Sequence, residues 1–321
     1  MNINRIGNTG VAVTDIAFGC SGIGNLYRQI SDADAAEVLA AAWGGGIRYF
    51  DTAPHYGRGL AEARLGQFLS TKSRDQYVLS TKVGRLLSPG DEMAEADGFV
   101  APLPNDVRYD YSGDGIEAAF AQSCQRLQTD FIDILYVHDI GCYTHGTENR
   151  AHMSDLLDSG LDRLQHLKDR GAIGAFGLGV NENQVCLDIM THRPLDAILL
   201  AGRLTLLDRS AEDELVPRCH AMGTSLILGG VFNSGILATG PVAGASYDYG
   251  QAPDDVLQEV ARLQEQAHGV GLPLPAAALQ FARHHSGVAS VLIGTAKPVS
   301  LMRNLAALEL PWTDAARRTF S

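Results

Sequence analysis

The sequence lacks the marks of several large classes of protein. Its five cysteines are scattered, odd in number and contain no Cys-x-x-Cys pair, which is typical of reduced thiols rather than of disulfides or a zinc site. No run of about 18 apolar residues occurs, so we expect no membrane span. The segment MNINRIGNTG has no basic region followed by an apolar one, so we expect no signal peptide and a cytoplasmic location.

Basic residues are also scarce. Lys and Arg number 25 against 37 Asp and Glu, which gives a net charge of −12. Nucleic acids and anionic lipids attract basic surfaces, so we expect neither as a partner. His138 and Asp139 with the loop histidines His145 and His152 do not have the spacing of a metal site, and we expect no metal. The sequence leaves open whether the chain forms a homo-oligomer.

No Pro/Gly/Ser linker and no block of charge divides the chain, so we expect one domain over residues 1–321. Short β-rich apolar runs alternate with longer amphipathic stretches. The predicted strands are Ile16–Cys20, Ile47–Phe50, Tyr77–Ser80, Ile132–Val137, Ile173–Leu178, Ala197–Leu200, Ser225–Leu228 and Ser290–Ile293. The predicted helices are Asp32–Trp43, Leu60–Leu69, Asp114–Leu127, Ser154–Lys168, Asn183–Met190, Ala211–Met222, Ala276–His285 and Ser300–Leu308. Such alternation indicates parallel pairing, because a parallel crossover needs a connection about as long as a helix.

Eight such units predict an α/β fold of the (β/α)8 TIM barrel type. A doubly wound open sheet is the rival, but no Gly-x-Gly-x-x-Gly follows the first strand. Residues 1–13, with Gly7 and Gly10, predict a hairpin that closes the barrel floor. The connection from Gly84 to Gly113 has little periodicity, and its place after the third strand predicts a long loop over the catalytic face.

Three ionisable residues follow three predicted strands: Asp51, Lys82 and His138. Tyr56 lies shortly after Asp51. Chemistry in such barrels takes place at the carboxyl ends of the strands, so these side chains are expected to converge. Each alone is more typical of a rim or core residue, but together they predict a catalytic site.

The residue types indicate proton transfer. Tyrosine has an ordinary pKa of about 10, and an ammonium group such as that of Lys82 should lower it. A buried Lys82 would need a carboxylate, which Asp51 can supply. His138 could hold and polarise a carbonyl oxygen beside Tyr56. The hydride of such a reaction must come from a cofactor, because no side chain can deliver it.

The segment 50–57, FDTAPHYG, resembles the active-site signature of the aldo-keto reductase family, and Ser80–Lys82 and Val137–Asp139 are similar to its next two strand-end motifs. The resemblance covers essentially the whole chain. Within the family, residues 81–86, 200–208 and 229–235 resemble the branch of aldose 1-dehydrogenases (L-fucose or D-threo-aldose) and pyridoxal 4-dehydrogenases. It implies Tyr56 as acid/base, with Lys82, Asp51 and His138 as the other catalytic residues.

The resemblance and the barrel together imply a nicotinamide cofactor, NAD in preference to NADP. The phosphates should lie after the last two strands, near a helix that starts at Pro298. The expected cofactor contacts are Gly22, Asn181, Asn233, Ser234, Gly235, Gly294, Thr295, Lys297, Arg303 and Asn304. NADP needs extra cations for its 2′-phosphate, and we find only Lys297 and Arg303. Two departures from the family are Ala201 where a glutamine is usual and Leu204 where a ring usually stacks on the nicotinamide.

The expected activity is oxidation of a cyclic hemiacetal, an aldose at C1 or pyridoxal, to a lactone. Tyr27 and Arg203 are the candidate substrate contacts, and the loop tyrosines Tyr109 and Tyr111 are further ones. The alternatives are an NADPH-dependent reductase of small aldehydes and ketones and a non-catalytic regulatory subunit that keeps the cofactor. An aldolase that uses Lys82 as a Schiff base is a third, and it needs an uncharged lysine.

Overall fold

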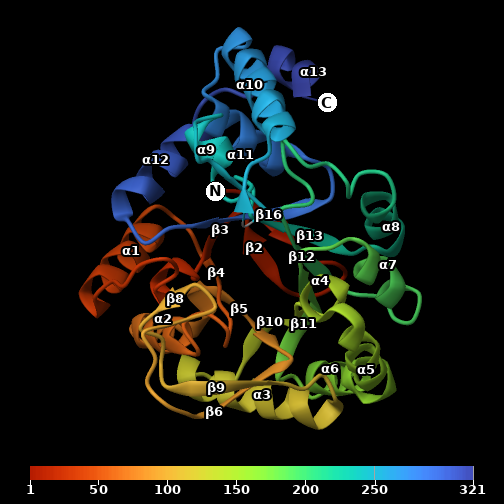
Figure 1. The fold of residues 1–321 in the computed structure, drawn as a ribbon. Coiled ribbons are helices and arrows are strands. Elements are labelled where there is room, and N and C mark those ends of the chain that lie inside the picture. The colour runs from red at the N-terminus through yellow and green to blue at the C-terminus, as the bar shows by residue number, and fades with distance from the viewer. Residues whose placement is uncertain (249, 321) are drawn as a thin grey trace.

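The structure is a computed structural model that describes residues 1–248 and 250–320. Eight parallel strands close into a barrel at its centre (Figure 1). In order around the barrel, the strands are β3 (Ile16–Gly19), β4 (Tyr49–Asp51), β5 (Val78–Val83), β10 (Ile132–His138), β11 (Ile173–Val180), β12 (Ala197–Ala201), β13 (Ser225–Gly229) and β16 (Val288–Gly294). All eight overlap the predicted strands, and every neighbouring pair is parallel. The TIM-barrel prediction is confirmed, and the doubly wound alternative is wrong.

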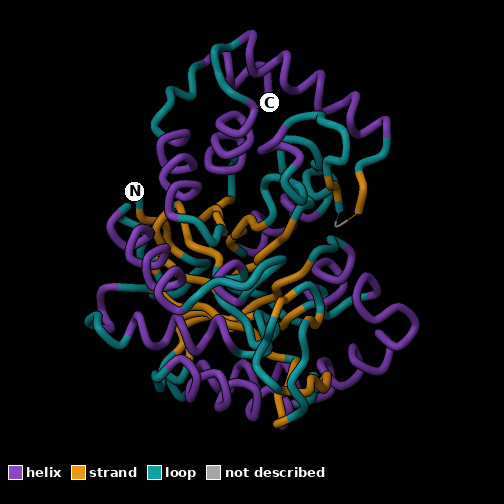
Figure 2. Tube along the Cα trace, turned by 60° about the vertical axis from the view of Figure 1, so that its left-hand side comes forward, coloured by secondary structure: helices purple, strands orange, loops and turns teal. Residues whose placement is uncertain are grey.

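Helices surround the barrel (Figures 1 and 2). The helices are α1 (Asp32–Gly44), α2 (Leu60–Leu69), α3 (Gly113–Leu127), α4 (Cys142–His145), α5 (Asn149–Asp155), α6 (Leu161–Asp169), α7 (Gln184–Met190), α8 (Leu215–Met222), α9 (Ile236–Thr239), α10 (Asp254–Gly269), α11 (Leu274–His284), α12 (Pro298–Leu308) and α13 (Asp314–Phe320). Short 3-10 turns occupy Gly22–Gly24, Arg74–Gln76 and Gly146–Glu148, and a π-helical turn, Leu156–Gly160, joins α5 to α6. None of the described helices is both long and apolar enough to cross a membrane.

The prediction for α2 matches its bounds, and that for α1 is right to within one residue. Ser31 caps α1 by accepting from the Asp34 amide, while the Asp34 carboxylate accepts from the Ser31 amide, which forms a complete capping box. The prediction for Ala211–Met222 starts too early, because residues 211–214 form turns and α8 begins at Leu215. Helix α10 was not predicted. It packs with α9, α11 and α13 around a second apolar cluster that includes Val260 and Leu263.

Each barrel strand alternates between two cores. On β3, Ile16 and Phe18 belong to the large cluster between the barrel and the helices, whereas Ala17 points into the barrel interior. The predicted N-terminal hairpin is present as β1 (Ile3–Arg5) and β2 (Ala12–Thr14). Its fully buried Ile6 and Val13 join the interior cluster, which places the hairpin over the amino ends of the strands.

The long connection after β5 is more ordered than the sequence indicated. It forms two antiparallel ribbons, β6 (Arg85–Pro89) with β9 (Asn105–Tyr109) and β7 (Glu95–Ala96) with β8 (Phe99–Val100). Gln122 of α3 donates to the Leu87 carbonyl and accepts from the Leu87 amide, at 2.9 and 3.1 Å, and so fixes the first ribbon to the barrel's helices. Strands of two to five residues are too short for a periodic pattern, which is why the sequence showed only a loop.

Candidate active site

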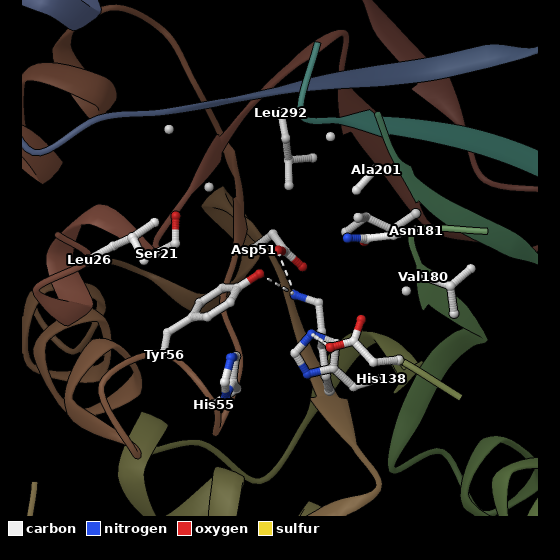
Figure 3. A pocket seen from close by; sticks show the side chains of 18 of the residues that line it. Ser21, Leu26, Asp51, His55, Tyr56, His138, Val180, Asn181, Ala201 and Leu292 are labelled. Carbon is white, nitrogen blue, oxygen red and sulfur yellow. Dashed lines mark hydrogen bonds and ion pairs between the residues drawn. The ribbon is translucent and has the colours of Figure 1, made fainter. Parts of the chain in front are cut away.

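Lys82 lies at the centre of the predicted catalytic residues. Its ammonium nitrogen donates to Asp51 Oδ2 at 2.7 Å, to the Thr52 carbonyl at 2.8 Å and to the Tyr56 hydroxyl at 3.3 Å (Figure 3). Because β4 and β5 are adjacent parallel strands, Asp51 and Lys82 reach the same end of the barrel. The side chains of Lys82 and Asp51 are 2% and 1% exposed, so this ion pair is screened from water.

Asp51 is held from both sides. Its Oδ1 accepts from the Ser80 hydroxyl at 2.7 Å, and the same hydroxyl lies 3.1 Å from the Tyr49 hydroxyl. The Tyr49 hydroxyl in turn lies 3.1 Å from that of Tyr136, deep in the barrel. A buried ion pair needs such additional hydrogen bonds to offset the loss of hydration. The polar layer beneath Asp51 therefore fixes the carboxylate that positions Lys82.

Lys82 keeps its charge in this setting. Burial opposes the charge, but the Asp51 carboxylate and Tyr56 outweigh it and raise the pKa of Lys82 above its ordinary value. A Schiff-base lysine needs the opposite shift. The site therefore disfavours the aldolase alternative.

Tyr56 comes from the turn after β4, and its ring points into the barrel mouth with the hydroxyl towards Lys82 (Figure 3). Burial raises the pKa of Tyr56 to about 12, although the Lys82 ammonium acts to lower it. We expected the ammonium to bring the pKa below its ordinary value. The direction of that effect is right, but desolvation of the phenolate is larger, so Tyr56 is a proton donor at neutral pH in the free protein.

His138 ends β10 and faces Tyr56 edge to face, with ring centroids 6.1 Å apart and an angle of 88° between the rings. Burial, followed by the charges of Arg85 and Lys82, holds the pKa of His138 well below its ordinary value. The neighbouring His55, whose ring centroid lies 5.9 Å away, has its pKa lowered to about 3, first by burial. Both imidazoles are therefore neutral at physiological pH, and His138 can act as a neutral hydrogen-bond donor.

These residues open into a cavity of about 550 Å³ at the carboxyl ends of the strands. Tyr56, Lys82, Asp51, His55 and His138 form one side of its lining. Small residues contribute to the remainder, namely Gly19, Gly179, Ala201, Gly229, Gly230 and Gly294. Ser21 and Leu26 lie beside Tyr56, and Val180, Asn181 and Ala201 lie across from it (Figure 3). The volume is that of a site for a small molecule.

The predicted cofactor residues divide into three groups. Asn181 and Gly294 line the cavity. Gly22 lies against the segment after β16, since a Cβ there would come within 3.0 Å of Thr295 and Ala296 backbone atoms. The other predicted residues do not line the cavity, namely Asn233, Ser234, Gly235, Thr295, Lys297, Arg303 and Asn304.

The side chain of Asn233 is engaged within the protein. Its Oδ1 accepts from Thr205 at 2.6 Å, and its Nδ2 donates to the Gly202 carbonyl at 3.2 Å, so it joins the loops after β12 and β13. Thr295 Oγ1 accepts from the Lys297 amide at 3.1 Å just before α12. Lys297 and Arg303 are exposed. Leu204 is buried in the apolar core, and Ala201 forms the cavity wall on that side.

The two predicted substrate contacts differ in placement. Tyr27 is 72% exposed and lines the cavity mouth. Arg203 does not line the cavity, because its guanidinium donates to the Asn181 carbonyl at 2.7 Å and pairs with Asp208 and Asp248. Arg203 was predicted to contact the substrate because it follows a strand. Here it holds three chain segments together.

Several lining residues were not predicted. Phe99 and Asp97 reach the cavity from the tip of the 85–109 connection, and the Phe99 ring centroid lies 6.0 Å from that of Tyr56. The main chain ties this tip to the loop after β3, where the Tyr27 amide donates to the Gly98 carbonyl at 2.8 Å. Tyr111, a candidate substrate contact, is instead fully buried and donates to the His138 carbonyl at 2.8 Å.

Arg85 lies in the segment 81–86 and was not predicted as a site residue, yet it is 4% exposed and contacts both His138 and Asp139. A charged residue inside an otherwise apolar segment is the signal that could have drawn attention to it. Within the described residues, no group of three or more His, Cys, Asp or Glu side chains is arranged to hold a metal ion.

The chain has well-defined relatives. It is 40% identical to the D-threo-aldose 1-dehydrogenase of a Pseudomonas species over 96% of this chain and 94% of that protein. It is 41% identical to the pyridoxal 4-dehydrogenase of Microbacterium luteolum over 94% and 91%. Among solved structures, the holo form of aldo-keto reductase AKR11C1 from Bacillus halodurans superposes with a TM-score of 0.78 at 25% identity, covering 100% of this chain and 95% of that one.

A family-level match agrees with these relatives. Residues 15–319 match the aldo/keto reductase family. The matched segment includes every barrel strand from β3 to β16 and all four predicted catalytic residues. Both 40% relatives are dehydrogenases, and the polar site at the barrel mouth has the acid/base groups that such chemistry requires. The chain therefore belongs to the aldo/keto reductase family of nicotinamide-dependent oxidoreductases.

Proposed function

We propose that this protein oxidises a cyclic hemiacetal, either an aldose at C1 or pyridoxal, to a lactone with NAD as the preferred acceptor. The observation that carries the proposal is the chain of contacts from Asp51 through Lys82 to the Tyr56 hydroxyl, beside a neutral His138, on the wall of the cavity. Two relatives at about 40% identity are named for an aldose and for pyridoxal, which support this substrate class. Both compounds form cyclic hemiacetals in water.

The cavity fits a nicotinamide. Gly19, Ala201, Gly229, Gly230 and Gly294 leave part of its wall without side chains beyond a methyl group, which suits a flat ring. We propose that Asn181, which lines the same cavity, binds the carboxamide. A bound nicotinamide would supply the hydride acceptor, which no side chain can provide.

The protein's own residues handle the oxygen and its proton. Tyr56, as phenolate, takes the proton of the anomeric hydroxyl, and Lys82 stabilises that phenolate through its ammonium. His138 donates to the same oxygen as it gains carbonyl character, without reorganising during the step. Overall, the hemiacetal and the oxidised cofactor become lactone, reduced cofactor and a released proton.

The cofactor's phosphates are proposed to lie at the start of α12, where Thr295 and Lys297 precede Pro298. Lys297 and Arg303 are the cations on this segment that were expected there. The structure adds Arg28, whose guanidinium donates to the Ala296 carbonyl at 3.1 Å. Three cations are few for binding the doubly charged 2′-phosphate of NADP, and we propose NAD for this reason.

The test is a comparison of kcat/KM for oxidation with NAD and with NADP across L-fucose, D-arabinose, L-galactose and pyridoxal. At least one of these is expected to be turned over, with NAD favoured, and the Tyr56→Phe variant serves as the matched control for contaminating activity. Pyridoxal should benefit from the aromatic wall made by Phe99, whereas a sugar should depend more on polar groups such as Ser21 and Thr144.

One observation favours a second candidate, an NADPH-dependent reductase of small aldehydes and ketones. With a pKa of about 12, Tyr56 keeps its proton at neutral pH, which is the state that reduction needs. If none of the four hemiacetals is oxidised while simple aldehydes are reduced efficiently with NADPH, this candidate replaces the first. The regulatory-subunit alternative is disfavoured because all four predicted catalytic side chains are present and line the same cavity.

A further inference from the structure

The buried guanidinium of Arg85 contacts the imidazole that faces the cavity. Arg85 begins β6, two residues after the last residue of β5, and one of its terminal nitrogens lies 2.6 Å from His138 Nδ1. A second terminal nitrogen donates to Asp139 Oδ2 at 2.8 Å. Arg85 and His138 are 4% and 6% exposed, so water does not compete for these contacts.

The chemistry of the pair fixes the protonation of the ring. A guanidinium has only donors and stays charged, so the ring nitrogen that it contacts must be an acceptor. Burial opposes the charge on Arg85, but Asp139 outweighs it, so the pKa of Arg85 is raised and the group does not titrate. His138 Nδ1 therefore has no hydrogen, and in a neutral imidazole the hydrogen must then reside on Nε2.

The same guanidinium restrains Asp139. His138 Nε2 lies 3.4 Å from Asp139 Oδ2, which is longer than an ordinary N–H···O hydrogen bond of about 2.7–3.2 Å. Oδ2 already accepts from Arg85. The Nε2 hydrogen is consequently available to a substrate oxygen instead of being bound tightly to the carboxylate.

We propose that Arg85 is a positioning residue that locks His138 in its Nε2–H tautomer, so that the imidazole presents a donor to the reacting oxygen. This deepens the proposed function, because it rests on His138 as the donor in that reaction. Without the guanidinium, the hydrogen could move to Nδ1, and Nε2 would then face the substrate's oxygen as a lone pair. The Nε2 lone pair would then repel the partial negative charge on the substrate oxygen, and no hydrogen bond would stabilise that charge in the transition state.

The direct test is ¹⁵N NMR of the full-length protein labelled at histidine nitrogens, with His138 assigned by comparison with His138→Gln. We expect wild-type His138 to show an unprotonated Nδ1 and a protonated Nε2 at neutral pH. This measurement needs no substrate, so it stays informative even if the proposed reaction is wrong. A protonated Nδ1 in the wild type would overturn the proposal without any variant of Arg85.

Three variants separate the contributions. Arg85→Met removes both contacts and should give a mixture of tautomers, with kcat lowered about tenfold or more and the cofactor's KM nearly unchanged. Arg85→Lys keeps a pure donor for Nδ1, so it should preserve the tautomer and recover part of kcat. Arg108→Met is the matched control. Arg108 lies on β9, where it pairs with Leu86 of β6, and its side chain is exposed and does not contact His138.

The pH dependence provides a second readout. The groups around the imidazole are Arg85, Lys82, His55, Asp139 and Tyr56, together with the Tyr111 hydroxyl on its carbonyl. Loss of the guanidinium should bring an acidic limb into the pH profile of kcat/KM, since one of the two cations that keep His138 neutral is gone. An Arg85→Met protein that retains the Nε2–H tautomer would sink the proposal, even if its activity is low.

Discussion

Gly179 of β11 lies against the aliphatic stem of Lys82, which comes from β5 on the other side of β10. A methyl group on Gly179 would come within 3.3 Å of Lys82 Cε and 3.5 Å of Lys82 Cδ. Glycine at this position leaves the lysine room to reach both Asp51 and Tyr56. The contact lies inside the barrel, where neighbouring side chains have little space to move.

The first prediction follows from that contact. Gly179→Ala should displace the Lys82 ammonium by a few tenths of an ångström and lower kcat about three- to tenfold, because the contact to Tyr56 is already 3.3 Å long. The free energy of unfolding should fall by no more than about 1–3 kcal/mol, the usual cost of overpacking. Steady-state kinetics and urea unfolding measure the two effects. Gly10→Ala, where a Cβ meets no atom within 4 Å, is the matched control.

The second prediction concerns the proton-transfer group. Tyr56→Phe should lower turnover by roughly 100-fold or more, while binding of the reduced cofactor, measured by fluorescence titration, stays within about twofold. The ring and its contact with Phe99 remain in this variant, so only the hydroxyl is lost. Near-normal turnover would refute the assignment of Tyr56 as acid/base.

The third prediction separates charge from stability at Lys82. Lys82→Met leaves the Asp51 carboxylate buried without its cation, which should cost roughly 3–5 kcal/mol of unfolding free energy. The double variant Lys82→Met/Asp51→Leu should recover most of that stability but none of the activity. If Lys82→Met loses as much activity as the double variant but its free energy of unfolding is unchanged, the ion pair stabilises the fold less than its geometry indicates.

The fourth prediction is the pH dependence of the two directions. Oxidation needs the Tyr56 phenolate, and with a pKa of about 12 the deprotonated fraction is small at neutral pH and rises as the pH rises. The logarithm of kcat/KM for oxidation should therefore climb by up to about one per pH unit between pH 7 and 10. Reduction needs the phenol and should stay level over the same range. In Lys82→Met, residual oxidation should reach its plateau at still higher pH, since the ammonium acts to lower the pKa.

The convergence of Asp51, Lys82 and His138 could be predicted because it depends only on chain order. Once the strands are assigned and parallel, their carboxyl ends meet at one face of the barrel whatever the loops do. The hairpin at the barrel floor was predicted from a local pattern instead, the glycines Gly7 and Gly10 within residues 1–13. Neither conclusion needed the orientation of a single side chain.

Arg85 and Arg203 show where that reasoning stops. Both follow a strand, but their partners differ. Arg203 pairs with Asp248, 45 residues away, whereas Arg85 contacts the buried His138, and no sequence pattern distinguishes the two. Those outcomes depend on how the connections after β5 and β13 fold, which the order of the strands does not determine. The raised pKa of Tyr56 could not be predicted from the sequence either, because desolvation is its largest cause and depends on the assembled cavity.

The ribbon of β6 and β9 has a bearing on how such an enzyme can acquire new substrates. Its base pairs Arg85 with Tyr109, so the segment leaves and rejoins the barrel at neighbouring points, as an insertion does that can be exchanged without disturbing the scaffold. Its tip brings Asp97 and Phe99 to the cavity, while its base holds the arginine that contacts His138. Evolution or design can therefore graft a new tip between residues 90 and 104 to alter selectivity, but the graft has to preserve the base to retain the chemistry.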